Sequence, residues 1–203
     1  MIEIKKNVLI VGGSSSLGKS IVNVFLKKNF NVLATFFSNK NNLNTEVKYI
    51  ELNLLSKSSI MKSIKLIKNN FKFDVVIFLP AVIHGKKLQD YSIEEINSCM
   101  NINFSNQAFF LGKILNNLSN KCCVLFVSSI SGEKGSFDPI YAASKGAQNS
   151  FVKSLALWLS PKIRVNAIAP SLIEDSNMFF NMKNNLRKIH QSTNPMKKLL
   201  TLK

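Results

Sequence analysis

The stretch Val8-Leu9-Ile10-Val11-Gly12-Gly13-Ser14-Ser15-Ser16-Leu17-Gly18 decides the fold class of this chain. Four apolar residues run into a glycine-rich turn, and apolar residues then recur at helical spacing. Glycines permit a tight turn and let a phosphate group approach the backbone amides at the start of a helix. The stretch therefore predicts a β-strand, a turn and a helix that could receive the pyrophosphate of a dinucleotide.

The alternation of short apolar runs with longer helical patterns continues along the 203 residues. It is typical of βαβ units, in which helices cover both faces of a parallel sheet. The predicted strands are Val8–Val11, Phe30–Phe36, Val47–Leu52, Val75–Leu79, Cys123–Ser128 and Arg164–Ala169. The predicted helices are Leu17–Lys28, Ser58–Asn69, Ile93–Leu118 with a break near Asn101, and Tyr141–Leu159. We expect one α/β domain over residues 1–203, a three-layer α/β/α Rossmann-type fold with a doubly wound parallel sheet of six strands.

The formal net charge of +16 does not by itself predict a nucleic-acid partner. Only Arg164 and Arg187 are arginines, whereas proteins that read bases and phosphates usually use arginine forks. The lysines are scattered, so we expect solvated lysines on a soluble enzyme, with polyanion binding as the alternative. No apolar run reaches the length of about 20 residues that a membrane-spanning helix needs, so no membrane partner is expected.

The three cysteines, Cys99, Cys122 and Cys123, lack the paired spacing of a zinc site. Their odd number also argues against a disulfide framework. We expect no metal and a cytoplasmic location.

A second motif is Tyr141-Ala142-Ala143-Ser144-Lys145, in which a phenol and an ammonium stand four residues apart. On a helix this spacing places both groups on one face. The ammonium should favour the phenolate and lower the pKa of Tyr141 from its usual value of about 10. The pair is therefore a candidate for proton transfer, although the same spacing in a lysine-rich helix also arises as a surface pair.

The glycine turn and the Tyr-x-x-x-Lys motif together resemble the short-chain dehydrogenase/reductase family, whose cofactor loop reads T-G-x-x-x-G-x-G. That pattern falls on Val11, Gly12, Ser16 and Gly18, so two of its four positions depart. Ser16 either keeps φ below zero or carries strain, and its hydroxyl could donate to a phosphate. The resemblance implies a cofactor held by Gly12, Ser14, Ser15, Ser16, Leu17, Gly18, Ser38, Lys40, Asn53, Tyr141, Lys145, Pro170 and Ile173.

The segment after the second predicted strand favours NADP(H), with NAD(H) as the second option. Phe36-Phe37-Ser38-Asn39-Lys40 contains no acid for the ribose hydroxyls of NAD. Ser38, Asn39 or Lys40 could instead bind a 2′-phosphate, which a carboxylate would repel.

The resemblance also assigns catalytic roles. Tyr141 would transfer the proton, Lys145 would lower its pKa and hold the nicotinamide ribose, and Asn103 would support a water-mediated proton path to the lysine. Ser129, in Val127-Ser128-Ser129-Ile130-Ser131-Gly132, would polarise the substrate carbonyl. Ser128 stays the alternative, because its distance from Tyr141 is the more usual one for the family.

Two segments depart from the family pattern. Phe78-Leu79-Pro80-Ala81 stands where members usually have N-N-A-G, and the chain stops at Lys203 where members commonly continue through a helix and a seventh strand. We expect residues 176–192 to form a substrate lid, and an exposed sheet edge to be covered by a partner subunit in a homodimer or homotetramer.

The expected function is hydride transfer between a nicotinamide cofactor and a small-molecule carbonyl or alcohol. The alternative is a dinucleotide-binding subunit, or a pseudoenzyme with little catalytic activity, because the cofactor loops are altered and the chain is short.

Overall fold

The fold is described from a computed structural model, which covers residues 5–38, 43–68 and 70–202. Its centre is a parallel sheet with the strand order β3-β2-β1-β4-β5-β6. The strands are β1 (Asn7–Val11), β2 (Asn31–Phe36), β3 (Lys48–Glu51), β4 (Phe73–Phe78), β5 (Leu118–Val127) and β6 (Arg164–Ile168). The prediction of a six-stranded, Rossmann-type parallel sheet is confirmed.

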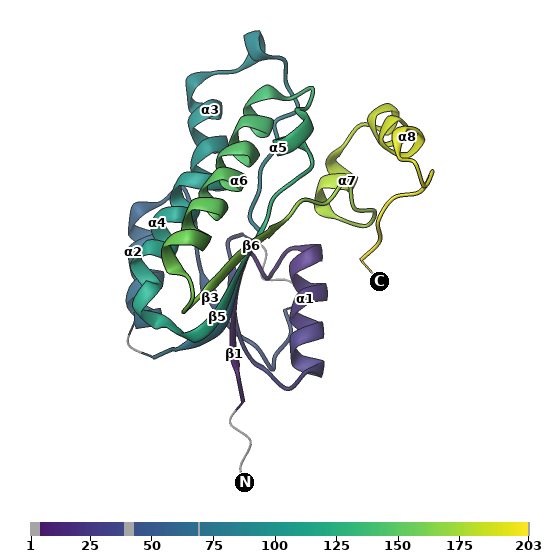
Figure 1. The fold of residues 1–203 in the computed structure, drawn as a ribbon. Helices are drawn as coiled ribbons and strands as arrows, with labels where there is room; N and C mark the ends of the chain where they lie inside the picture. Colours follow the sequence, from purple (N-terminus) through teal and green to yellow (C-terminus); the bar gives the residue numbers. More distant parts are fainter. Residues whose placement is uncertain (1–4, 39–42, 69, 203) are drawn as a thin grey trace.

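The sheet is covered on both faces, which explains its apolar strands. Val8 pairs with Val32 of β2 and with Val75 of β4, and residues 8–11 are completely buried. Helix α1 (Ser16–Lys27) lies on one face, and α2 (Lys57–Lys68), α4 (Asn106–Ile114) and α6 (Pro139–Leu159) lie on the other (Figure 1). The larger hydrophobic core, from Leu9 to Val165, fills the α2–α4–α6 side. A smaller core, which includes Val8 and Val22, lies under α1.

The helix predicted over Ile93–Leu118 is not continuous. It consists of α3 (Ile93–Met100), a π-helical turn η2 (Asn101–Ser105), α4 and a short 3-10 turn η3 (Leu115–Asn117). The irregular turn begins at Asn101, where the break was predicted. It places the side chain of Asn103 in the interior, completely buried. Such π-turns disturb the helical ladder and often occur beside functional sites.

Strand β5 begins five residues earlier than predicted, at Leu118 rather than Cys123. Its first part contains the exposed polar residues Asn120 and Lys121, which interrupt the apolar run by which a buried strand is predicted. The register against β4 also shifts in this part, because Phe73 pairs with Leu118 whereas Val75 pairs with Cys123.

Two positions in the strand order bear on the site, the reversal beside β1 and the outer edge of β6. The order reverses beside β1, and ligands of such sheets bind beyond the carboxyl ends of the strands at that point. Among the described residues no strand pairs with the outer edge of β6, and Ile168 on β6 is 50% exposed.

Beyond β6 the chain forms α7 (Asn177–Asn181) and α8 (Asn184–Thr193), within the segment predicted as a lid, and Ile173 bridges to Leu200. The remaining helical elements are η1 (Leu88–Asp90) and α5 (Ser131–Lys134).

Gly132 on α5 is required by the close approach of α5 to α6. A Cβ atom at this position would lie 2.7 Å from the backbone carbon of Lys145. We expect Gly132→Ala to lower the free energy of unfolding by about 2 kcal/mol, because backbone cannot yield as a flexible side chain would. Urea unfolding followed by circular dichroism measures the change.

Gly112 on α4 is the matched control, because a Cβ there meets no atom within 4 Å. Gly112→Ala should raise stability by about 0.5–1 kcal/mol through helix propensity alone. Equal effects of the two substitutions would contradict the packing argument for Gly132.

Candidate active site

A cleft of about 830 Å³ opens at the carboxyl ends of the strands. It runs from the β1–α1 turn, past the ends of β2 and β3, to α6 and the lid helices. Most residues predicted to bind a cofactor line it: Gly12, Ser14, Ser15, Ser16, Leu17, Ser38, Asn53, Tyr141, Lys145, Pro170 and Ile173. Gly18 is buried and does not line the cleft, and Lys40 lies outside the described residues.

The β1–α1 turn is held by its own hydrogen bonds. Gly12 has a φ of +85°, a conformation that favours glycine. The Ser15 side chain caps α1, because its Oγ accepts from the Gly18 amide at 3.0 Å and donates to the Gly12 carbonyl oxygen at 2.9 Å. The N-terminus of α1 therefore faces the cleft from a rigid turn, and its amides favour an anionic ligand there.

Ser16, which departs from the family glycine, carries no positive φ and begins α1. Its amide and its hydroxyl both donate to Asn177 Oδ1, at 3.1 and 2.6 Å, and its Oγ accepts from the Asn177 amide at 3.0 Å. Asn177 begins α7, so these bonds fasten the lid to the turn. Sequence reasoning missed Asn177, since nothing local marks a contact between residues 161 positions apart.

The segment that departs from the family's N-N-A-G pattern lies next to Gly12. Leu79, Pro80 and Ala81 line the cleft. A Cβ on Gly12 would lie 3.3 Å from both Leu79 Cβ and Pro80 Cδ, so this segment packs directly against the glycine turn. Asn53 also lines the cleft, and its Oδ1 accepts from the Leu55 amide at 2.9 Å.

Tyr141 and Lys145 lie one turn apart on α6 and are 4% and 1% exposed. The ammonium Nζ donates to the Val127 carbonyl oxygen at 2.9 Å and lies 6.0 Å from the centroid of the Tyr141 ring. Burial lowers the pKa of Lys145 to about 8, because the interior disfavours its charged form.

The prediction that Lys145 lowers the pKa of Tyr141 is wrong in its direction for this structure. Burial raises the pKa of Tyr141, and a hydrogen bond with Ser129 only partly opposes that rise. The ammonium is directed at the Val127 carbonyl oxygen, so it does not offset the desolvation of the phenolate.

The two candidate serines at the end of β5 have different surroundings, although both line the cleft. Ser128 Oγ donates to the backbone oxygen of Lys145 at 3.4 Å, which ties β5 to α6. The Ser129 side chain acts on the Tyr141 side chain and opposes the rise of its pKa, and the Ser129 Oγ also accepts from the Ser131 amide at 3.1 Å. Ser129 therefore lies closer to the chemistry of Tyr141.

Asn103 does not line the cleft; its side chain holds two segments together behind it. Its Oδ1 accepts from the Val82 amide at 2.8 Å, and its Nδ2 donates to the Val82 carbonyl oxygen and to Ser144 Oγ, both at 2.9 Å. Ser144 lies between Tyr141 and Lys145 on α6. The side chain of Asn103 thus joins the loop after β4 to the helix that carries the two candidate catalytic residues.

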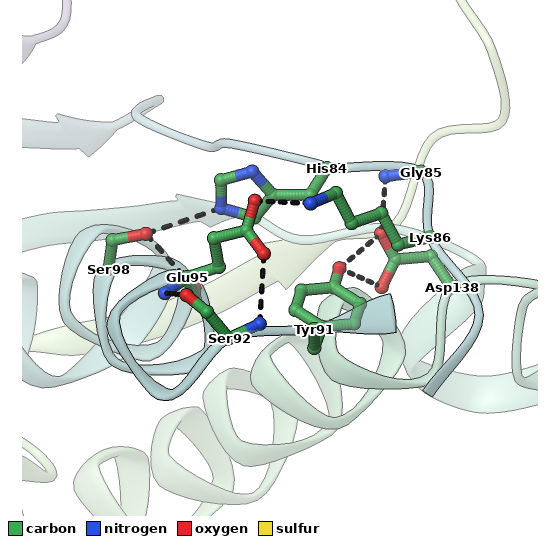
Figure 2. Close-up of polar contacts among 8 residues, drawn as sticks. All are labelled: His84, Gly85, Lys86, Tyr91, Ser92, Glu95, Ser98 and Asp138. Atoms are coloured by element: carbon green, nitrogen blue, oxygen red, sulfur yellow. Dashed lines mark hydrogen bonds and ion pairs between the residues drawn. The ribbon is translucent and has the colours of Figure 1, made fainter. Parts of the chain in front are cut away.

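Asp138 was not predicted, although an Asp before Pro139 at a helix start is a capping signal. Its buried carboxylate accepts from the Gly85 amide at 2.8 Å and the Tyr91 hydroxyl at 2.7 Å (Figure 2). It also accepts from the Tyr141 amide at 2.9 Å. Burial and this hydrogen bond raise the pKa of Tyr91. The carboxylate therefore fixes the first turn of α6, and with it Tyr141, to the loop after β4.

The segment predicted as a lid contributes apolar side chains to the lining of the cleft. Met178, Met182, Leu186 and Ile189 line it, together with His190, whose pKa is lowered by burial. Ser176 caps α7, since its Oγ accepts from the Phe179 amide at 3.1 Å.

In the described ranges, no three His, Cys, Asp or Glu side chains are grouped so that they could hold a metal ion. Within those ranges, too, no helix has the length and apolar character to cross a membrane.

Comparisons with known proteins place the chain among enzymes of one family. The family model described as short chain dehydrogenase matches residues 6–187. The 3-oxoacyl-[acyl-carrier-protein] reductase of Buchnera aphidicola subsp. Baizongia pistaciae is 32% identical, over 98% of this chain and 86% of the relative. The reductase of the same name from Buchnera aphidicola subsp. Schizaphis graminum is 27% identical, over 97% and 85%.

A solved structure of a short chain dehydrogenase family protein from Francisella tularensis superimposes with a TM-score of 0.90. It is 25% identical, and the match covers 98% of this chain and 87% of that one.

The Asp138 contacts give a prediction for stability. Asp138→Ala should lower the free energy of unfolding by about 3 kcal/mol, because three buried or half-buried donors lose their acceptor. Tyr91→Phe removes only one donor and should cost about 1 kcal/mol. Urea midpoints at constant m-value measure both, and equal losses for the two variants would contradict a shared carboxylate anchor.

Proposed function

The chain belongs to the short-chain dehydrogenase family, and we propose that within this family it reduces the ketone of a 3-oxoacyl thioester with NADPH. The family membership makes it an NAD(P)-dependent oxidoreductase that interconverts carbonyl and alcohol groups. The substrate class is supported above all by the match to a 3-oxoacyl-[acyl-carrier-protein] reductase over 98% of the chain.

The cofactor end of the cleft suits a dinucleotide. The N-terminus of α1 offers backbone amides, and the turn before it has no room for larger residues, since a Cβ on Gly13 would lie 2.7 Å from Ala34 Cβ. Gly12, Ser14, Ser15, Ser16 and Leu17 would hold the pyrophosphate, supported by Gly18 from behind. Asn53 would lie near the adenine, and Pro170 and Ile173 near the nicotinamide. The cofactor supplies a hydride to the carbonyl carbon.

Tyr141 donates the proton that the reduced carbonyl oxygen needs. Its raised pKa keeps the phenol protonated at neutral pH, which suits donation. Lys145 would hold the nicotinamide ribose. Ser129 donates a hydrogen bond to the carbonyl oxygen, and Asn103 supports the relay by fixing α6.

The apolar residues of the predicted lid favour a substrate with an apolar tail. Met178, Met182, Leu186 and Ile189 offer apolar surface in the cleft that Tyr141 also lines, and burial disfavours a charge on His190. A 3-oxoacyl chain would leave its thioester carrier outside the cleft and place its ketone at Ser129 and Tyr141. The alternative of a dinucleotide-binding subunit with little activity is less favoured, because the relatives are named as reductases.

We also infer that the protein works as one domain in the cytoplasm, as a homodimer or homotetramer. Leu157 and Trp158 at the end of α6 are 83% and 69% exposed, and a second copy would bury them.

The cofactor preference gives the first prediction about enzymatic activity. We expect kcat/KM for NADPH to exceed that for NADH by about tenfold or more, since a phosphate contact is a charge-assisted hydrogen bond. Ser38→Asp should reverse the preference by repelling the 2′-phosphate. Initial rates with acetoacetyl-coenzyme A and each cofactor measure it. Comparable constants for both cofactors in the unchanged protein would refute the preference.

The proton donor gives the second prediction. Tyr141→Phe should reduce kcat by at least about a hundredfold, because the carbonyl oxygen then has no general acid. Fluorescence titration with NADPH should give a Kd within about threefold of the original, which separates chemistry from binding. Retained turnover in this variant would overturn the role of Tyr141. An unchanged protein that oxidises no NADPH with any carbonyl compound would overturn the proposed function itself.

A further inference from the structure

Two glutamines, Gln107 on α4 and Gln148 on α6, are each 1% exposed. Gln148 follows Lys145 by three residues, so the two side chains share one face of α6. A buried amide must satisfy its donors and acceptors, or it costs about 1–3 kcal/mol of stability. The hydrogen-bond partners of these two side-chain amides therefore indicate the role of the two residues.

The amides form a chain of contacts that ends on the ammonium of Lys145. Gln148 Oε1 accepts from Lys145 Nζ at 3.4 Å. Gln148 Nε2 donates to the Asn103 carbonyl oxygen and to Gln107 Oε1, each at 3.2 Å. Gln107 Nε2 in turn donates to the Pro80 and Ile102 carbonyl oxygens, at 2.8 and 2.7 Å.

These contacts determine which atom of Gln148 faces the lysine. Both acceptors on the far side, the Asn103 carbonyl oxygen and Gln107 Oε1, require the nitrogen of the Gln148 amide. Gln107 is oriented in the same way, since its own nitrogen is taken by two carbonyl oxygens. The amide oxygen of Gln148 is thus left for Lys145, and it cannot flip without losing both bonds.

Lys145 needs such an acceptor, because its charge is buried without a counterion. No carboxylate of the described residues forms an ion pair with it. Val127 O and Gln148 Oε1 accept two of the three ammonium hydrogens, which leaves one for the cleft that Lys145 lines.

We propose that Gln148, held by Gln107, is a positioning residue that keeps the Lys145 ammonium charged and aimed into the cleft during carbonyl reduction. The proposal rests on the proposed function, because it assigns a supporting residue to that reaction. The same amide chain reaches Pro80, so it also links the ammonium to the loop that packs on the glycine turn.

The groups that face Lys145 define what a pH measurement would report. On α6 the titratable neighbour is Tyr141, and on α3 it is Cys99, whose pKa is raised by burial. Asp138 at the start of α6 acts on Tyr141 and Cys99. β5 contributes a neutral group, Val127 O, and η2 and α4 contribute the neutral groups of Asn103 and Gln107, which act through Gln148.

Paired substitutions at residue 148 give the decisive test. Gln148→Met keeps the shape and removes the acceptor, so Lys145 should lose its proton at lower pH. The basic limb of the kcat–pH profile for NADPH-dependent reduction should then move down by about one unit. Gln148→Glu places a carboxylate beside the ammonium and should move the same limb up by about one unit. A merely structural role would not shift the profile in opposite directions.

Asn117→Leu is the matched control. Asn117 is another buried amide, whose Nδ2 donates to the Phe71 carbonyl oxygen at 2.7 Å, far from Lys145 along the sheet. Its loss should lower the thermal midpoint and leave the pH profile in place. The ¹⁵N shift of Lys145 Nζ against pH gives the same readout by NMR without turnover.

The outcomes separate the two proposals. A folded Gln148→Met variant with an unchanged basic limb and an unchanged Lys145 titration overturns the role of Gln148, whatever its thermal midpoint. If the unchanged protein oxidises no NADPH, the proposed function fails, and the NMR titration still decides whether Gln148 sets the charge of Lys145.

Discussion

The Lys145 ammonium donates to the Val127 carbonyl oxygen at 2.9 Å in a position where only 1% of the residue is exposed. Burying a charge costs free energy unless hydrogen bonds replace the lost water. The surrounding structure supplies those bonds from the last carbonyl of β5 and from Gln148. α6 must lie close against β5 for these contacts to form, and the close packing of Gly132 on the backbone of Lys145 is part of that arrangement.

The position of α6 is fixed from several sides by polar side chains rather than by apolar packing alone. Asp138 caps its first turn and joins it to Gly85 and Tyr91, while Asn103 joins Ser144 to Val82. Both links end in the loop after β4, which departs most from the family pattern. That loop therefore supports the site through its backbone groups, which do not depend on the N-N-A-G side chains.

A second link joins the cofactor turn to the lid. Where the family has a glycine, Ser16 exchanges hydrogen bonds with Asn177 at the start of α7. A ligand phosphate at the N-terminus of α1 would meet the same amide that Asn177 now engages.

The sequence by itself determined the order of strands and helices, the glycine turn and the spacing of Tyr141 and Lys145. These features are local, because hydrophobic periodicity and the steric need for glycine act over a few residues. Only the tertiary structure showed the different surroundings of Ser128 and Ser129, reversed the expected direction of the Tyr141 pKa, and identified Asp138, Asn177 and the Gln107–Gln148 pair. Several of the contacts behind these results join residues far apart in the sequence, such as Gln107 with Gln148, which are 41 positions apart, and Ser16 with Asn177, which are 161 positions apart. Burial and hydrogen-bond geometry at such separations exist only once the chain has folded.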